Sequence, residues 1–234
     1  MRILITGANR GLGYFLTKLG LEKGHIIVAG VRSLEVSAIR LLVPLQEMYK
    51  EKLEIVQLDV TNEQSVLFAA ESAKEKGKQI DSIINNAGVL LERDKSIEEL
   101  DIEECMKTID INTLGPMRVI KHFLPLLEQG EKQSIINITS EAGSLTNAYS
   151  GDYPYGISKV ALNMFSEKLN VYLRGKDIHV FAVHPGWMRT DMGGEQAPTD
   201  PTDTAEGIYD MIERNVTING QYVFVDFKGQ PMKI

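Results

Sequence analysis

A tyrosine and a lysine stand four residues apart in the segment Tyr155-Gly156-Ile157-Ser158-Lys159. On a helix, side chains four residues apart share a face, so the phenol and the ammonium would lie side by side. A neighbouring ammonium favours the phenolate and should lower the pKa of the tyrosine from its usual value of about 10. Such a pair can give or take a proton near neutral pH. The same spacing also occurs in ordinary amphipathic helices.

Further polar residues precede or follow this pair. Ser140 ends an apolar, strand-like run and can polarise a substrate carbonyl. Asn112 lies in a long helical stretch, where asparagine has poor propensity, so it has either a specific polar task or a solvated position. His184 ends another strand-like run. Because Tyr155 and Lys159 already supply the proton chemistry, we predict that His184 is not catalytic.

The first apolar run leads into a glycine-rich segment, TGANRGLG, at residues 6–13. Gly7 permits a tight turn, and Gly11 and Gly13 allow close approach of the backbone and the next helix. A helix that begins here offers free N–H groups and the positive end of its dipole to a pyrophosphate. The spacing G-x-x-x-G-x-G differs from the common dinucleotide pattern G-x-G-x-x-G. By itself the segment fits a plain glycine-rich turn equally well.

Small or polar residues also end three other strand-like runs. Asp59 can accept a hydrogen bond from an adenine amino group, or it can cap the helix that follows. The segment Asn85-Asn86-Ala87-Gly88 lets the backbone contact a cofactor ribose, or it forms a polar turn. Pro185-Gly186 turns the chain, and Thr190 can then contact the polar end of a cofactor.

These residues must be positioned by a chain in which short apolar runs alternate with longer amphipathic stretches. Continuous apolar runs are typical of strands covered on both faces, and repeated strand–helix units predict a doubly wound parallel sheet with ligands beyond the carboxyl ends of its strands. The expected strands span residues 2–6, 25–31, 53–60, 80–88, 133–140, 177–186 and about 221–227. The expected helices span residues 13–23, 34–51 with a break at Pro44, a segment capped by Thr61 or Asn62, 103–128 with a bend before Pro116, 155–174 and about 203–214. We expect a single α/β domain, 1–234, with about seven strands and helices on both faces.

Composition narrows the possible functions. The 234 residues carry a formal net charge of −7 and have no long basic run, so nucleic acid is not an expected partner. The single cysteine, Cys105, cannot form an intrachain disulfide, and with no histidine near it we predict a structural role. His25, His122 and His179 lack metal-ligand spacing, so no metal is expected. The chain has neither a signal-peptide pattern nor an apolar run of about 18 residues, which predicts a cytoplasmic protein without a membrane partner.

Taken in chain order, the motifs resemble those of the short-chain dehydrogenase/reductase family, and within it the C-factor and sniffer-like carbonyl reductases. The resemblance rests on Thr6-Gly7-x-x-x-Gly11-x-Gly13, Asp59, Asn85-Asn86-Ala87-Gly88, Asn112, Ser140, Tyr155-x-x-x-Lys159 and Pro185-Gly186. The resemblance to the C-factor and sniffer-like carbonyl reductases rests on the stretches TGANRGLG, YPYGISKVALN and HPGWMRTDMGG. The resemblance implies a Rossmann fold and hydride transfer with a nicotinamide cofactor.

It also implies a role for each residue. Tyr155 would be the general acid in reduction and the base in oxidation, and Lys159 would hold the nicotinamide ribose and tune Tyr155. Ser140 would hydrogen-bond the substrate oxygen, and Asn112 would hold a water in a proton relay. The expected cofactor-binding residues are Thr6, Gly7, Asn9, Arg10, Gly11, Leu12, Gly13, Arg32, Asp59, Val60, Asn86, Ala87, Gly88, Tyr155, Lys159, Pro185, Gly186 and Thr190.

The end of the second expected strand indicates which cofactor binds. An acidic residue there usually holds the ribose hydroxyls of NAD. This strand instead ends Gly30-Val31-Arg32, and the first acid is Glu35. Arg32, together with Arg10 of the glycine loop, can pair with the 2′-phosphate of NADP, although either arginine could be a surface residue. We therefore predict NADP(H).

The sequence departs from many members of the family in two places. Ser140 stands 15 positions before Tyr155 (155 − 140 = 15), slightly farther than in many members, which leaves Ser144 and Tyr153 as weaker rivals for the serine and tyrosine roles. The segment after Thr190 is short, which predicts a small lid and an exposed site.

Two functions fit these features. The first is an NADPH-dependent reductase of a small ketone or aldehyde, which the intact set of four catalytic candidates favours. The alternative is a cofactor-binding signalling or regulatory protein of the C-factor type with little turnover. The resemblance also makes a homodimer plausible, through the expected helices 103–128 and 155–174.

Overall fold

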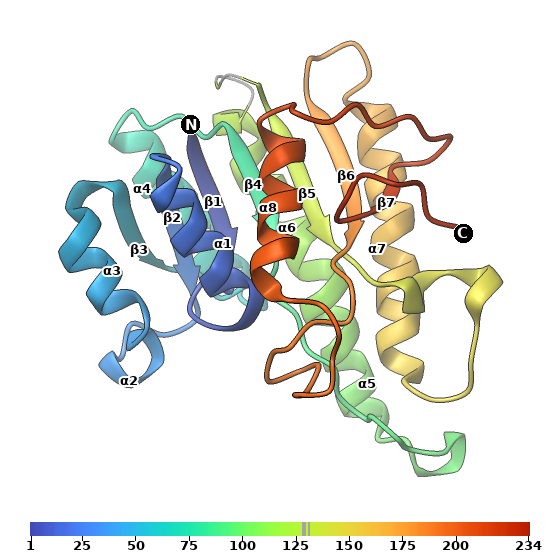
Figure 1. Ribbon diagram of the computed structural model, residues 1–234. Coiled ribbons are helices and arrows are strands. Elements are labelled where there is room, and N and C mark those ends of the chain that lie inside the picture. Colours follow the sequence, from blue (N-terminus) through green and yellow to red (C-terminus); the bar gives the residue numbers. More distant parts are fainter. Residues whose placement is uncertain (128–129, 131) are drawn as a thin grey trace.

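A computed structural model of the chain describes residues 1–127, 130 and 132–234, and Figure 1 shows its arrangement. Within these residues, parallel strands form one seven-stranded sheet in the order β3-β2-β1-β4-β5-β6-β7. The strands are β1 (Arg2–Thr6), β2 (Ile26–Val31), β3 (Leu53–Gln57), β4 (Ser82–Asn85), β5 (Ser134–Ile138), β6 (His179–His184) and β7 (Phe224–Asp226). The chain order reverses between β1 and β4, which is the switch point where doubly wound sheets bind ligands.

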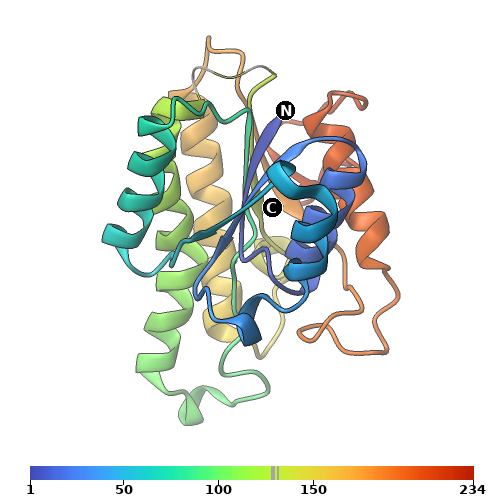
Figure 2. The ribbon, with the colours of Figure 1, turned by 90° about the vertical axis from the view of Figure 1, so that its left-hand side faces the viewer.

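Helices cover both faces of this sheet. They are α1 (Gly11–Glu22), α2 (Val36–Ile39), α3 (Leu42–Tyr49), α4 (Glu63–Glu75), α5 (Ile102–Ile109), α6 (Gly115–Leu127), α7 (Tyr153–Tyr172) and α8 (Pro201–Ile212). The edge-on view of Figure 2 shows α1, α3 and α8 on one side of the strands and α4, α6 and α7 on the other. The predicted fold class, a doubly wound parallel sheet with helices on both faces, is confirmed.

The alternation of side chains along the strands divides the core into two layers. Ile3 and Ile5 of β1 pack into the layer beneath α1 and α8, whereas Leu4 packs into the layer beneath α4 and α6. All three side chains are fully buried. Strands buried on both faces are near-continuous apolar runs. The buried polar side chains of β4 and β5 bond to each other, Ser134 to Ser82 at 2.9 Å and Asn85 to Asn137 at 2.8 Å. Polar side chains can therefore reach a ligand only from the strand ends and the loops beyond them.

Several expected boundaries differ from the structure. The strand expected at 53–60 ends at Gln57, so residues 58–60 belong to the loop that follows. The helix expected at 34–51 is divided into α2 and α3, and the break lies at residues 40–41 instead of at Pro44. Pro44 is the third residue of α3, where the backbone N–H has no intrahelical partner to lose.

The helix expected at 103–128 also has a more complex form. It consists of α5, a π-helical turn at Asp110–Leu114, and α6. The turn lies just before Pro116, where a bend was predicted, and residue 128 lies outside the described residues. In the part of the chain that is described, no helix combines the length and apolar character needed to cross a bilayer.

Candidate functional site

A cavity of about 910 Å³ opens at the carboxyl edge of the sheet, across the switch point. The predicted site residues that line it are Gly7, Asn9, Arg10, Gly11, Leu12, Arg32, Asp59, Val60, Asn86, Ala87, Gly88, Ser140, Tyr155, Lys159, Pro185, Gly186 and Thr190. Thr6, Gly13 and Asn112 lie behind its wall. The fold thus brings residues from distant loops to one hollow, as parallel strand ends should.

The glycine loop after β1 has a backbone that other residues would disturb. Gly7 has a φ of +64°, and a Cβ atom added there would lie 3.0 Å from the Cα of Ala87. A Cβ at Gly13 would collide with the carbonyl oxygen of Gly7 and with the side chain of Asn86. These glycines therefore let α1 and the turn after β4 approach the loop closely.

The start of α1 points unpaired backbone donors at the cavity. The first intrahelical hydrogen bond runs from the N–H of Tyr14 to the carbonyl of Arg10, at 3.2 Å. The amides of Gly11, Leu12 and Gly13 precede it, and Arg10 makes no side-chain capping bond. Free amides at the positive end of a helix dipole suit a phosphate group.

Thr6 has a different position from the one predicted. Its side chain is buried, and its Oγ1 accepts hydrogen bonds from the N–H groups of Asn86 and Ala87, both at 3.0 Å. The Nδ2 of Asn86 donates in return to the carbonyls of Thr6, at 3.0 Å, and Gly7, at 3.2 Å. Thr6 therefore positions the turn after β4 from behind the wall instead of contacting a cofactor directly.

One end of the cavity carries positive charge. Arg10 and Arg32 both line it, and neither has an ion-pair partner among the described residues. Asn9 closes the loop there by donating to the carbonyl of Ala38 at 2.9 Å. Asp59 accepts from both the N–H and the hydroxyl of Thr61, at 2.9 and 2.7 Å, in the turn before α4. It does not cap that helix, because the N-cap is Asn62, whose side chain accepts from the N–H of Ser65 at 3.1 Å.

Tyr155, Ser140 and Lys159 meet at the other end. The Ser140 hydroxyl lies close enough to the phenol of Tyr155 to lower its pKa, and the Nζ of Lys159 lies 5.3 Å from the centroid of the Tyr155 ring. Lys159 is only 4% exposed and donates to the carbonyl of Ile138 at 2.8 Å. Its burial lowers the pKa of the ammonium to about 8.

The predicted lowering of the Tyr155 pKa is wrong. Burial of the phenol raises its pKa and outweighs the influence of the Ser140 hydroxyl, which acts in the opposite direction. The negative charge of Asp152 raises the pKa further, whereas the positive charge of Arg93 lowers it. The phenol is therefore held in its protonated form, which is the form that a general acid needs.

Asn112 lies in the π-helical turn, a distortion that often occurs at functional sites. Its Oδ1 accepts from the N–H of Val89 at 2.9 Å, and its Nδ2 donates to the carbonyl of Val89 at 2.9 Å and to the Oγ of Ser158 at 3.0 Å. Both amide hydrogens are thus used within the protein. The side chain therefore ties the loop after β4 to α7, and the implied role of Asn112 in holding a water stays a prediction.

Sequence reasoning missed Ser158. Its Oγ accepts from Asn112 and donates to the carbonyl of Tyr155 at 2.7 Å, so it connects the π-helical turn to the first turn of α7. Its position three residues after Tyr155, on the same helix face, was the available signal.

The structure also distinguishes the other candidates. Ser144 and Tyr153 do not line the cavity, and the Ser144 hydroxyl instead pairs with that of Thr146 at 3.0 Å. His184 lines it, but its Nδ1 accepts from the N–H of Glu141 at 3.1 Å, and burial lowers its pKa. It therefore supports the turn that follows Ser140, in line with the predicted non-catalytic role.

Apolar side chains that were not predicted complete the walls: Leu90, Leu91, Trp187, Met188 and Met192. The indole N–H of Trp187 donates to the carbonyl of Gly193 at 2.7 Å, which fixes the ring at the rim. These residues lie in loops, where no hydrophobic period marks them in the sequence.

Comparisons with known proteins agree with this geometry. A family model described as short chain dehydrogenase matches residues 1–201. The C-signal protein of Myxococcus xanthus is 37% identical over 152 residues, which cover 64% of this chain and 90% of that protein. The NADPH-bound carbonyl reductase from chicken fatty liver is 28% identical, with a TM-score of 0.88 over 100% of this chain and 98% of that one. The carbonyl reductase Sniffer of D. melanogaster is 29% identical, with a TM-score of 0.89 over 100% and 99%.

The family match spans most of the chain, and the two solved structures cover all of it. The expected resemblance, including the likeness to C-factor and sniffer-like reductases, is confirmed. The chain therefore belongs to the short-chain dehydrogenase/reductase family of oxidoreductases.

Proposed function

We propose that this protein is an NADPH-dependent reductase that converts a ketone or an aldehyde into an alcohol, with Tyr155 as the general acid. The observation that carries the proposal is the meeting of Tyr155, Ser140 and Lys159 at one end of a cavity whose other end offers free helix amides and two arginines. The carbonyl reductases of similar structure support the choice of reaction.

In this mechanism the hydroxyls of Ser140 and Tyr155 orient the substrate by hydrogen bonds to its carbonyl oxygen. When bound, NADPH supplies the hydride that reduces the carbonyl carbon. Tyr155, kept protonated by burial, donates its proton to the oxygen and becomes a phenolate. The nearby Lys159 ammonium stabilises that negative charge. In the oxidation of an alcohol, the same phenolate would take up the proton.

The residues at the opposite end fit the phosphate groups of a dinucleotide. The amides of Gly11 and Leu12, which line the cavity, would hold the pyrophosphate, and Arg10 with Arg32 would pair with the 2′-phosphate that distinguishes NADP from NAD. A carboxylate in place of Arg32 would repel that phosphate. The NADPH named for the chicken carbonyl reductase supports this choice.

The reductase proposal is tested with a panel of aldehydes and ketones, following NADPH oxidation. We expect Tyr155→Phe to lower kcat by about 10²–10⁴-fold, the range for loss of a general acid or base, while NADPH still binds. Tyr153→Phe is the matched control and should retain wild-type turnover. If wild type turns over no carbonyl compound, or if Tyr155→Phe equals it, the regulatory alternative is the better description.

The cofactor proposal is tested with Arg32→Asp. Losing a charge-assisted hydrogen bond and adding repulsion should reduce the NADPH-over-NADH ratio of kcat/KM by at least about tenfold. Arg174→Asp, at an exposed and distant arginine, should leave the ratio unchanged. An unchanged ratio in Arg32→Asp would remove Arg32 from the phosphate site.

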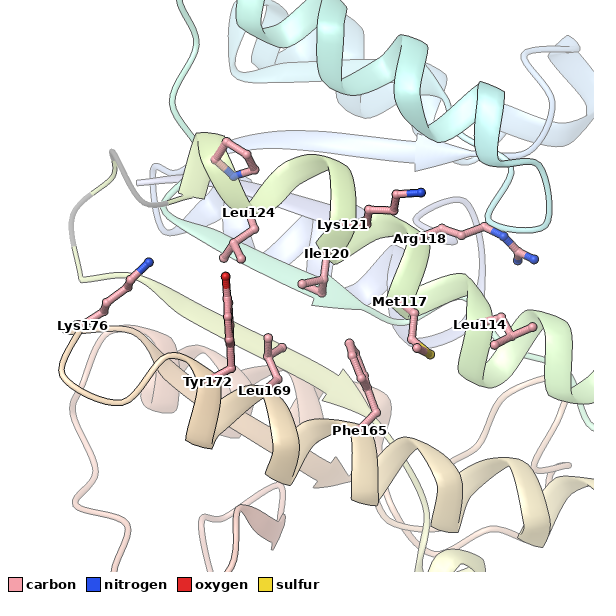
Figure 3. Close-up of a pocket in the computed structure, with 11 residues that line it drawn as sticks. Leu114, Met117, Arg118, Ile120, Lys121, Leu124, Phe165, Leu169, Tyr172 and Lys176 are labelled. Carbon is pink, nitrogen blue, oxygen red and sulfur yellow. The ribbon is translucent and has the colours of Figure 1, made fainter.

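We also propose a homodimer through α6 and α7. A groove of about 700 Å³ between these helices is lined mainly by apolar side chains, shown in Figure 3. Leu114 of the π-helical turn and Met117 and Ile120 of α6 face Phe165, Leu169 and Tyr172 of α7. Tyr172 is 70% exposed and Leu114 and Met117 are each 41% exposed. A second copy of the same apolar face would cover this surface.

A further inference from the structure

Arginines without a carboxylate partner gather at the cavity. Elsewhere, four arginines form ion pairs with Asp or Glu, namely Arg2, Arg118, Arg189 and Arg214. The described residues provide no such partner for the other five arginines, and three of these five, Arg10, Arg32 and Arg93, line the cavity. In a chain with a net charge of −7, an unpaired guanidinium in a hollow indicates an anionic ligand. Arg10 and Arg32 fit the cofactor phosphate, which leaves Arg93 unexplained.

Arg93 is close enough to the reacting end of the cavity to influence Tyr155. Its positive charge lowers the pKa of that phenol, against the larger effect of burial. One guanidinium N–H, on Nη2, donates to the carbonyl of Met192 at 3.0 Å. Within the described part of the chain, Nε and Nη1 make no hydrogen bond or ion pair. A carboxylate could therefore still bind to the guanidinium near the substrate carbonyl.

The backbone on both sides of Arg93 holds an uncommon conformation. Glu92 has a φ of +56° and Asp94 a φ of +61°, in the left-handed region that non-glycine residues seldom adopt. The carboxylate of Glu92 anchors the segment by accepting from the N–H of Asp101 at 2.8 Å. Such strain persists where surrounding contacts enforce it, and it often marks ligand sites.

The remaining charges around Tyr155 limit where an anion can bind. Asp152 accepts from the hydroxyl of Tyr149 at 3.1 Å, and Glu141 lies 3.9 Å from His184. Asp191 also lines the cavity. Two cations lie at this end, Lys159 and Arg93. Because Lys159 is assigned to the Tyr155 phenolate, Arg93 is the cation left for an anionic group of the substrate. The apolar walls formed by Leu90, Leu91 and Trp187 suit the body of the same molecule.

We propose that Arg93 is a specificity-determining residue that binds a carboxylate of the substrate. The substrate is then a keto acid or an aldehyde acid with an apolar body, whose carboxylate pairs with the guanidinium while its carbonyl lies at Tyr155. This inference rests on the proposed reductase function, which it deepens by naming a class of substrate.

The test uses binding of two small molecules of the same shape. Benzoate carries a carboxylate and benzamide a neutral amide, and each is titrated into the complex of the full chain with NADP⁺. The single tryptophan, Trp187, lies at the cavity, so its fluorescence reports binding. We expect wild type to bind benzoate at least about tenfold more tightly than benzamide, as a charge-assisted hydrogen bond would provide.

Arg93→Gln should reduce this benzoate-to-benzamide ratio by about tenfold, and Arg93→Lys should restore part of it. Arg174→Gln, an exposed arginine far from the cavity, should keep the wild-type ratio. The proposal is overturned if wild type does not prefer benzoate. It is also overturned if Arg93→Gln weakens the binding of benzoate and benzamide equally, because Arg93 would then only position the Met192 segment.

A second measurement separates this inference from the proposed function. The kcat/KM for 4-carboxybenzaldehyde is compared with that for its methyl ester, in wild type and in Arg93→Gln. We expect the acid-to-ester ratio to fall at least about tenfold in the variant, chiefly through KM. If neither aldehyde nor any other carbonyl compound is reduced, the reductase proposal fails, whereas the binding titration still decides the role of Arg93.

Discussion

Two hollows of similar size differ sharply in what surrounds them. The cavity at the sheet edge, of about 910 Å³, is lined by glycine-rich loops, by Tyr155, Ser140 and the buried Lys159, and by three arginines that have no carboxylate partner among the described residues. The groove between α6 and α7, of about 700 Å³, is lined mainly by leucine, methionine and aromatic side chains. Two of its cations are already neutralised, because Arg118 pairs with Asp110 and Lys121 with Glu63.

The volume of a cavity therefore does not by itself indicate whether it binds a small ligand or another protein. Strand ends and helix N-termini deliver unpaired polar groups to the cavity, where a ligand can satisfy them. Helix flanks deliver apolar side chains to the groove, where another protein surface can cover them. Changes in the cavity should therefore alter catalysis, and changes in the groove should alter association.

Loss of Lys159 should have the largest effect. We expect Lys159→Met to lower kcat/KM by about 10²–10⁴-fold, because the variant removes the charge that stabilises the Tyr155 phenolate. Steady-state kinetics with NADPH measures this. Lys168→Met, on the exposed side of the same helix, is the matched control. Equal losses in both variants would mean that damage to α7, and not the ammonium, causes the effect.

The buried ammonium should also make stability depend on pH. The pKa of Lys159 is about 8 in the folded protein and near 10.5 when unfolded, so between these values the unfolded chain binds more protons. The free energy of unfolding should then rise with pH across this window by up to about 3 kcal/mol, relative to Lys159→Met.

Urea unfolding of both proteins from pH 7 to 10.5 measures this difference, with Lys168→Met keeping the wild-type profile. Parallel profiles for wild type and Lys159→Met would contradict the burial of a charged group.

Asn112 lies behind the cavity wall, and its replacement should lower the stability of the protein. We expect Asn112→Ala to lower the free energy of unfolding by about 2–3 kcal/mol, since it removes three hydrogen bonds to the half-buried Val89 backbone and to the buried Ser158 hydroxyl. Asn163→Ala should cost less, about 1 kcal/mol, because that side chain donates only one bond, at 3.3 Å to Gly143. Urea unfolding compares the two variants. A larger loss of stability for Asn163→Ala would contradict the role of Asn112 in joining the loop after β4 to α7.

A substitution in the groove should have the smallest effect on the stability and kinetics of a single subunit. Tyr172→Glu places a charge on an exposed apolar surface, so we expect a change in the free energy of unfolding within about 0.5 kcal/mol and wild-type kinetics. The molecular mass in solution should fall from that of a dimer to that of a monomer, as measured by light scattering after gel filtration. A wild-type protein that is already monomeric would refute the homodimer.

Much of the fold could be predicted because its signals are local. Continuous apolar runs such as Ile3-Leu4-Ile5 mark buried strands, and glycines mark the turns that follow. Element ends were harder to predict. The run 53–60 continues past β3 because Leu58 and Val60 are buried in the loop beyond the strand, and burial alone does not distinguish the two.

The sequence predicted which residues form the site better than it predicted what each of them does there. Thr6 and Asn112 were expected to contact the cofactor or a water, yet their side chains bond to the backbones of Ala87 and Val89. Such bonds join residues more than 20 positions apart. No pattern within either segment reveals them, because the partner is decided by how the loops pack.

The alternation of strands and helices, the glycine loop and the family could all be identified from the sequence. These depend on residue type and short spacing, which the chain carries locally. Only the tertiary structure decided that burial raises the pKa of Tyr155 although a lysine stands beside it, and that Arg93 has no carboxylate partner in the described residues. Both depend on desolvation and on neighbours brought together from distant parts of the chain.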